Sequence, residues 1–260
     1  MKYISLVALY GAKPSSFSSF VARGQTRIVD LLGRSFQPYN MHQIHATITA
    51  LQDVPGTQYW NANFYQYRHR EEPMDFEGFL DFLRYGNYFP FYVRIGAFKP
   101  VEHPFLSQAQ TPYERSFILQ GDKAVMIGWP IYWDGQAVPH QLDILSKDIV
   151  YPHVLEEIRR AFQSFNILHS YHSKETDVDN DFYFRIGQIR QGILDDSLRE
   201  RVRAILRDVL SEEEPLILEI RRADIFIVVS EDETFRPSAT RAWSIIDPQV
   251  SPEFIKSLYV

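Results

Sequence analysis

Short apolar runs edged by Gly, Pro, Asp or Asn recur along the chain, and their β-branched and aromatic residues predict strands. The expected strands are 3–10, 44–51, 91–98, 116–120, 124–129, 181–189 and 216–229. Longer segments with apolar residues three and four positions apart predict amphipathic helices between them. The expected helices are 18–32, 75–85, 153–165, 198–210 and a last short one starting at Ser251-Pro252.

Strands and helices alternate in a similar order in the two halves of the chain. We therefore expect an α+β fold of two similar lobes, each a mostly antiparallel sheet with helices on its outer face, around a central cleft. The hexapeptides 91–96 and 182–187 are similar in sequence and hint at a duplication. A length of 260 residues with 45% hydrophobic residues permits one large core, so we expect a single bilobal domain over 1–260 with interleaved lobes.

Charge and composition narrow the choice of partners. A net charge of −6 argues against long duplex DNA, because gripping it requires clustered Lys and Arg, yet it leaves room for a local anion pocket. The absence of cysteine excludes disulfides, thiolate metal sites and cysteine nucleophiles. No run approaches the roughly 18 apolar residues that cross a bilayer. We expect a cytoplasmic protein with no membrane partner, and we interpret 4–12 as a buried first strand rather than a signal peptide. The oligomeric state is left open.

The segment His45-Ala46-Thr47-Ile48-Thr49 is the most informative part of the sequence. Strand periodicity places His45, Thr47 and Thr49 on one face, with Ala46 and Ile48 on the other. An imidazole and a hydroxyl two residues apart can meet one phosphate group, the first transferring a proton and the second donating a hydrogen bond. The alternative is a half-exposed strand face on which His and Thr are ordinary polar residues.

In this context the chain resembles the two-histidine (2H) phosphoesterase superfamily, which includes the 2′,5′ RNA ligase-like and RNA cyclic phosphodiesterase proteins. The first H-x-T motif of that family is similar to residues 45–48, and the following strand is similar to 90–96. The resemblance is one of element order and covers about residues 2–230. It implies two histidines that act as general base and general acid on a nucleotide phosphodiester, without a metal or other cofactor.

The second motif of the family should fall near 181–184, where the sequence departs from the pattern. Asp181 stands in place of the histidine and Tyr183 in place of the hydroxyl residue. An aspartate can act as a base, but it acts as an acid near neutral pH only if burial or a neighbouring carboxylate raises its pKa. We therefore expect His45, Thr47 and Asp181 as the catalytic candidates of a degenerate site.

Strand parity adds four residues to the expected cleft. Tyr183 and Arg185 share the face of Asp181, and Tyr92 and Arg94 have the same parity on 91–98. Arginine is well matched to phosphate oxygens and tyrosine to a stacked base. The alternative is that the arginines pair with surface carboxylates.

The segment 169–181 suggests a metal site, but this interpretation has less support than the phosphoesterase resemblance. His169 and His172 precede Asp177, Asp179 and Asp181, and zinc binds histidine together with carboxylates. The spacing is unspecific, so we expect no metal. Three functions then stay open. The first is hydrolysis of a 2′,3′-cyclic phosphate or a similar nucleotide phosphodiester, and the second is binding of a small nucleotide or RNA terminus by a protein of the same fold that has lost catalysis. The third is a structural role or the mediation of protein contacts.

Overall fold

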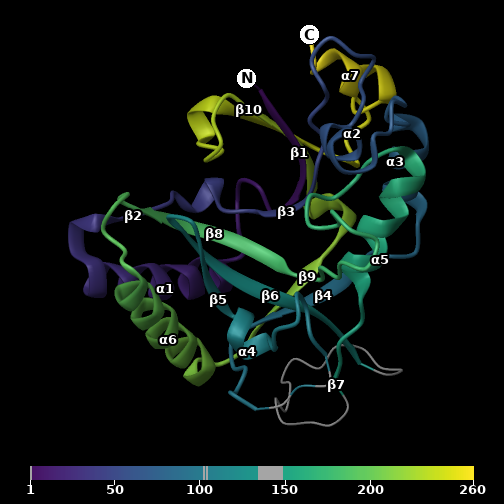
Figure 1. Cartoon of the computed structure of the whole chain (residues 1–260). Helices are drawn as coiled ribbons and strands as arrows, with labels where there is room; N and C mark the ends of the chain where they lie inside the picture. The colour runs from purple at the N-terminus through teal and green to yellow at the C-terminus, as the bar shows by residue number, and fades with distance from the viewer. Residues whose placement is uncertain (1, 102, 104, 134–148) are drawn as a thin grey trace.

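One large antiparallel sheet runs through the computed structural model, which describes residues 2–101, 103, 105–133 and 149–260 (Figure 1). The main strand order is β11-β10-β1-β3-β8-β6-β4-β9, with β2 added beside β8 and with β5 and β7 added beside β6. The strands are β1 (Tyr3–Ala8), β2 (Phe36–Pro38), β3 (Ala46–Ala50), β4 (Phe91–Ile95), β5 (Phe117–Gln120), β6 (Lys123–Trp133), β7 (Ile149–Val150), β8 (Phe182–Ile189), β9 (Leu216–Ile220), β10 (Ile225–Ser230) and β11 (Thr240–Ser244). The α+β class with a large antiparallel sheet is confirmed.

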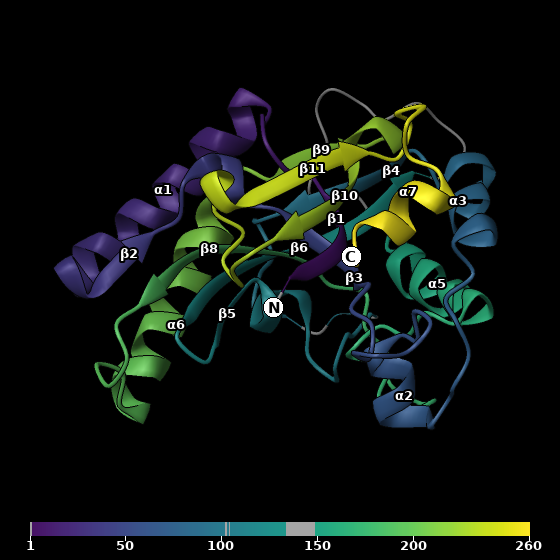
Figure 2. The same cartoon turned by 90° about the horizontal axis from the view of Figure 1, so that it is seen from above.

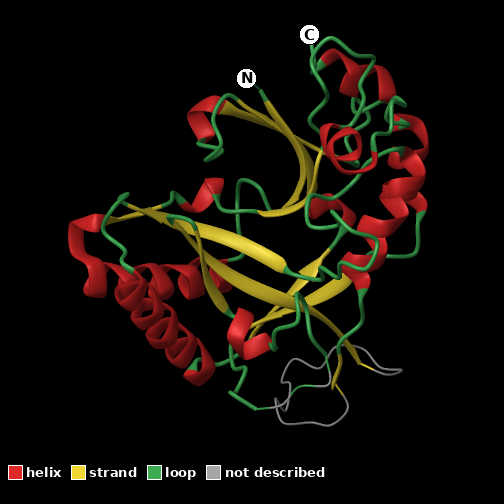
Figure 3. Cartoon of the chain, in the orientation of Figure 1, coloured by secondary structure: helices red, strands yellow, loops and turns green. Residues whose placement is uncertain are grey.

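The helices form two groups at opposite flanks of the sheet, which Figures 2 and 3 show from two directions. They are α1 (Ser15–Leu32), α2 (Ala62–Arg68), α3 (Phe76–Tyr85), α4 (Pro112–Arg115), α5 (Val154–Ala161), α6 (Asp196–Glu212) and α7 (Pro252–Ser257). Helices α1 and α6 pack together on one flank, and α3 packs against α7 on the other. No helix in the described ranges is both long enough and apolar enough to cross a bilayer.

The main core lies between the helices and one face of the sheet. Alternate strand residues point into it, as period-two alternation requires. Ala46 and Ile48 of β3 and Phe184 of β8 are completely buried there. Phe17 of α1 packs on Phe184 with their ring centroids 4.8 Å apart. This packing fixes which side of β3 and β8 faces away from the core.

Two smaller apolar clusters lie on the other face of the sheet. One surrounds Trp129 on β6 and includes Phe105, and the other joins Val7, Val228 and Phe235. In the strand order, β3 and β8 come between the strands that carry these clusters. The polar residues of β3 and β8 therefore form a strip with an apolar cluster on each side.

The structure differs from the sequence-based expectation at several elements. The expected strand 216–229 is two strands, because a short turn at Arg222–Asp224 separates β9 beside β4 from β10 beside β1. Helix α6 begins two residues before the expected start at 198, because Asp195 caps it by accepting from the Leu198 N–H at 2.7 Å. The sequence did not indicate α2, α4, β2, β7 or β11.

The similar hexapeptides do not occupy equivalent places. Residues 91–95 form β4, next to the sheet edge, whereas 182–187 belong to β8 at its centre. The similarity therefore gives no support to a duplication.

Candidate functional site

The candidate site is built on the contact between β3 and β8. These strands pair antiparallel at Ala46 and Phe184, which confirms that segments 44–51 and 181–189 lie side by side. Since both paired residues face the core, their neighbours His45, Thr47, Tyr183 and Arg185 share the opposite face. These four side chains are half-buried. The structure therefore brings together four of the seven residues singled out from the sequence.

His45 is held in one tautomer. Its Nδ1 lies 2.7 Å from the main-chain carbonyl of Gln43, which can only accept, so Nδ1 carries the proton and Nε2 is an acceptor. Burial lowers the pKa of His45 to about 4; the Gln43 bond opposes this, and the nearby Arg185 and Lys13 charges add to it. His45 is therefore neutral near pH 7, with a basic nitrogen free among the described residues.

The surroundings of His45 fix its orientation. Its ring meets that of Phe235 edge to face, with centroids 4.8 Å apart, and that of Tyr10 at 5.9 Å. The Gln43 side chain is buried and donates to the carbonyl of Thr234 at 2.8 Å. The backbone that orients the imidazole is thus tied to the segment that follows β10.

Arg159 of α5 binds both strands beyond their paired residues. Its Nη2 donates to the carbonyls of Thr47 at 3.2 Å and Asp181 at 3.1 Å, and its Nε donates to Ile48 at 3.0 Å. Its Nη1 donates to the carbonyl of Asp179 at 3.0 Å and to the Asp179 carboxylate at 3.1 Å. All five N–H groups of this fully buried guanidinium are used. Arg159 therefore holds β3 and β8 in position as they diverge.

Asp181 is not presented on the open strip. Its side chain is 1% exposed and ion-paired with Arg115 of α4. Burial raises the pKa of Asp181, the charge of Asp179 adds to this, and Arg115 opposes it. Residues of the preceding loop close over the same region, since the Asn180 N–H donates to the Ser107 hydroxyl at 3.2 Å. Asp181, which the sequence suggested as a catalytic residue, is therefore buried and not accessible to a substrate on the strip.

A small cavity lies beside this ion pair, with Tyr171 and Tyr183 in its wall. Its volume is about 10 Å³, which is close to the space that one water needs. The Oδ1 of Asp181 and the Nε of Arg115 are buried there without a partner in the described part of the chain. The cavity can hold a bridging water but is too small for a nucleotide.

Tyr183 and Arg185 complete the strip. Burial raises the pKa of Tyr183 to about 12, and its ring meets Tyr171 edge to face at 6.3 Å. Arg185 donates from Nη2 to the side-chain oxygen of Gln120 at 3.2 Å, while its Nε has no partner in the described ranges. Tyr183 is therefore a persistent hydrogen-bond donor. Because Nε is buried, the Arg185 donor left for a ligand is Nη1, which makes no hydrogen bond within the described ranges.

Tyr92 and Arg94 lie on the same face but not at the site. Their strand β4 is separated from β8 by β6, at about 4.8 Å per strand. Arg94 is buried and donates to Tyr151 at 2.9 Å and to the carbonyl of Ala97 at 2.8 Å. The parity predicted for β4 is correct, but the structure does not bring these two residues to His45.

His169 and His172 belong to a buried polar network beneath the strip. His169 contacts Asp179 at 2.9 Å, and His172 contacts Glu156 at 2.8 Å. Burial lowers the pKa of His169 to about 4. Each imidazole has its own carboxylate, and the described residues contain no group of three or more side chains placed to hold a metal ion. The contacts of the two histidines with Asp179 and Glu156 therefore explain why His and Asp residues are buried together in this segment.

Lys13 joins the site from the loop between β1 and α1. It is half-buried, its Nζ donates to the carbonyl of Gly11 at 2.6 Å, and burial lowers its pKa to about 7. Lys13, Arg115 and Arg159 were missed from the sequence, because no periodic pattern connects a loop, a four-residue helix or one helical arginine with the strands they contact. A basic residue directly before a helix was the available signal for Lys13.

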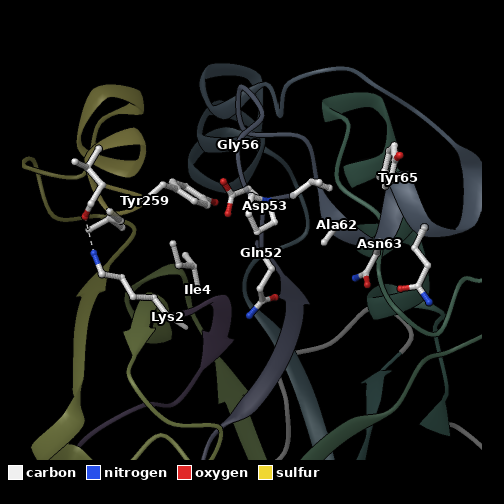
Figure 4. Close-up of a pocket in the computed structure, with 14 residues that line it drawn as sticks. Lys2, Ile4, Gln52, Asp53, Gly56, Ala62, Asn63, Tyr65 and Tyr259 are labelled. Carbon is white, nitrogen blue, oxygen red and sulfur yellow. Dashed lines mark hydrogen bonds between the residues drawn. The ribbon is translucent and has the colours of Figure 1, made fainter.

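The largest of the described cavities lies elsewhere, between the 52–56 loop, α2 and the end of the chain (Figure 4). Its volume is about 890 Å³, and its lining is mostly apolar with amide groups from Gln52 and Asn63. Lys2 closes one side by donating to the carbonyl of Val260 at 2.6 Å. None of the site residues expected from the sequence lines this cavity, and the charged side chains in its lining are Lys2 and Asp53, with no histidine or arginine among the described residues that form it.

Comparisons with family models, with curated proteins and with solved structures give no match for this chain.

Proposed function

We propose that the chain is a 2H phosphoesterase-like protein that binds the phosphate of a small nucleotide or RNA terminus on the strip formed by β3 and β8. The strand order supports this architecture, because four strands lie on each side of the β3–β8 contact. The connections match as well: β1 leads through α1 to β3, and β6 leads through α5 to β8. Two lobes related by an approximate twofold axis account for both observations.

The single observation that carries the proposal is the pairing of Ala46 with Phe184. An axis through this pair relates His45 to Tyr183 and Thr47 to Arg185. The second motif is then Tyr183-Phe184-Arg185-Ile186, two residues after the position inferred from the sequence. This assignment also explains why Asp181 is sealed against Arg115, since it lies outside the motif.

The chemistry of the four residues favours binding over hydrolysis. Arg185 and the Thr47 hydroxyl are donors suited to phosphate oxygens. Tyr183 stands where a second imidazole would protonate the leaving oxygen, but a phenol with a pKa of about 12 gives up its proton poorly. The strip retains the groups that hold a phosphate and lacks an efficient general acid.

Slow hydrolysis is a second candidate, favoured by the neutral His45 with its free Nε2. This nitrogen would take a proton from water as the water oxygen attacks phosphorus in a 2′,3′-cyclic phosphate. One ribose P–O bond breaks, and the leaving oxygen takes a proton from Tyr183 or solvent. Such a reaction needs no metal, so it should continue in EDTA.

Calorimetry with 3′-AMP and 2′,3′-cyclic AMP tests the binding proposal. Arg185→Ala should weaken binding by about tenfold or more, the scale of a lost charged hydrogen bond. Arg190→Ala is the matched control, because Arg190 follows the end of the same strand and is exposed. Failure of the wild-type protein to bind either nucleotide contradicts the proposal.

Restoring an imidazole tests the motif assignment. Tyr183→His should produce or increase hydrolysis of 2′,3′-cyclic AMP, by up to about 10²-fold for one acid–base group. Tyr183→Phe controls for loss of the phenol, and Asp181→His should give no gain because that position is covered. A gain from Asp181→His, with none from Tyr183→His, contradicts the assignment.

A further inference from the structure

Two cations beside His45 have no carboxylate to balance them. Arg185 lies across the strand pair from His45, because Ala46 pairs antiparallel with Phe184. The loop that carries Lys13 is bonded to the segment before His45 through the Gly11 N–H and the carbonyl of His42. Neither forms a salt bridge within the ranges that the structure describes, although both side chains are half-buried. Half-buried charges normally pair, because unpaired ones lose hydration without compensation. The strip therefore has two positive charges available for an anion.

The carboxylates that approach the strip are already engaged. Asp232 accepts from Arg236 at 3.0 Å, Glu233 pairs with Lys123 at 3.0 Å, and Asp122 accepts from the side-chain amide of Gln188 at 2.8 Å. None of the three can move onto the cations without breaking an existing contact. Lys13 and Arg185 therefore have no carboxylate available to pair with them in this region of the described structure.

Lys13 is held in place by backbone contacts. Its Nζ donates to the carbonyl of Gly11, and the Gly11 N–H donates to the carbonyl of His42 at 3.0 Å. This second bond ties the lysine loop to the segment that leads into His45. These two hydrogen bonds hold the Lys13 ammonium in one position beside the strip.

We infer that Lys13, acting with Arg185, makes this site select a dianionic phosphate monoester, the 2′- or 3′-phosphate of a ribonucleotide end, over a monoanionic cyclic diester. This inference rests on the proposed function and names its ligand class. A dianion balances both cations, whereas a monoanion leaves one unbalanced in a half-buried place. The two ligand classes differ by one charge at the same phosphorus.

The tautomer of His45 supports the same ligand class. Its Nε2 accepts a hydrogen bond, so it requires a donor from the ligand or from water. A ribonucleoside 3′-phosphate carries a free 2′-hydroxyl beside the phosphate, which can donate to this nitrogen. A cyclic 2′,3′-phosphate has used both hydroxyls in the ring and has no such donor.

Competition calorimetry with 3′-AMP and 2′,3′-cyclic AMP at pH 7 tests the inference. The wild-type protein should bind the monoester about tenfold or more tightly than the cyclic diester, as expected for one additional charge pair. Lys13→Met should lower this preference by about tenfold, leaving only what the 2′-hydroxyl contact with His45 supplies, and change the cyclic affinity little, whereas Lys13→Arg should retain the full preference. Lys99→Met is the matched control, because Lys99 is exposed and pairs with Glu212 outside the site.

The outcomes separate this inference from the function on which it rests. Equal binding of the two nucleotides by the wild-type protein, or a preference that is undiminished in Lys13→Met, overturns the role of Lys13 while the phosphate site stands. Binding of inorganic phosphate that depends on Lys13, without binding of either nucleotide, retains the anion site and overturns the nucleotide proposal. Absence of binding to all three probes overturns both. Weaker binding of 2′-deoxy-3′-AMP than of 3′-AMP supports the contact of the 2′-hydroxyl with His45.

Discussion

The guanidinium of Arg159 donates to the main-chain carbonyl of Thr47 at 3.2 Å. Thr47, whose hydroxyl is proposed to bind phosphate, is therefore positioned through its backbone by a buried cation. The same side chain donates to the carbonyl of Asp181, the residue directly before β8. One residue of α5 therefore sets the spacing of the two strands that form the site.

Arg159→Leu should lower the free energy of unfolding by about 3–5 kcal/mol, because it leaves the buried Asp179 carboxylate and several strand carbonyls without their donor. Urea unfolding followed by circular dichroism measures this. Arg23→Leu is the control, since its pair with Glu213 is largely exposed and should contribute about 0–1 kcal/mol. Comparable losses in the two variants would show that Arg159 has no special structural role.

Arg115 and Asp181 should behave as one unit in a double-mutant cycle. Arg115→Leu alone buries an unpaired carboxylate and should cost about 2–5 kcal/mol of unfolding free energy. Adding Asp181→Asn should recover part of that loss, because the neutral amide no longer requires a cation. Additive effects of the two changes in urea unfolding would show that the contact does not couple them.

Stability should fall on acidification through the pH range 6.5 to 4 because of His169. Burial lowers the folded-state pKa of His169 from 6.5 to about 4, so in this range the unfolded chain binds a proton that the folded chain excludes. The free energy of unfolding therefore rises with pH across this range, by on the order of 3 kcal/mol for one such group. The charged neighbours Arg159 and Asp179 and the ring of His172 face the same imidazole. His169→Gln should remove about half of the pH dependence measured by urea unfolding at pH 5 and 7, because burial lowers the pKa of His45 to about 4 as well and His45 contributes a similar slope. An unchanged slope assigns the acid sensitivity to other groups.

Affinity for 3′-AMP should fall as the pH rises from 7 to 9. Burial lowers the pKa of Lys13 to about 7, so the free protein loses the ammonium charge over this range while the phosphate is already dianionic. The loss should level off near the roughly tenfold that one charge pair contributes, because the protein with a neutral Lys13 still has Arg185 to bind the phosphate. His45 stays neutral there, and burial raises the pKa values of Tyr10 and Tyr39, which keeps both phenols neutral. Lys13→Arg should give a flat profile by calorimetry; a wild-type profile that is equally flat contradicts the role of Lys13.

Local patterns predicted the elements but not the contacts between them. Helix α3 and the central segments of β3 and β8 follow directly from periodicity, and the shared face of His45 and Thr47 follows from alternation. Strand order has no local signature. The face of the sheet that carries Arg94 was therefore predicted correctly, but its position beside His45 was wrong. Arg94 contacts Tyr151 instead.

The same limit applies to the charged residues around the site. Nothing in the sequence near Arg115 indicates Asp181 as its partner 66 residues away. The register of β3 against β8 could not be predicted from the sequence either. Asp181 and Tyr183 lie on the same face of the strand, so alternation alone does not say which of them is opposite the His45 motif. The pairing of Ala46 with Phe184 distinguishes them, and it depends on core packing across the whole sheet.

The apolar clusters that border the polar strip affect how a ligand arrives as well as how it is held. The whole chain has a net charge of −6, so a long RNA approaching it meets repulsion over most of the surface. Low-dielectric walls concentrate the field of Lys13 and Arg185 within the strip, and salt screens that field beyond about 8 Å at physiological ionic strength. A mononucleotide or a protruding end would fit within this range, whereas the trailing phosphates of a longer strand would extend beyond it and meet only the net negative charge of the chain. Discrimination by length would then be visible in association rates, with added salt accelerating the capture of long strands and slowing that of short ones.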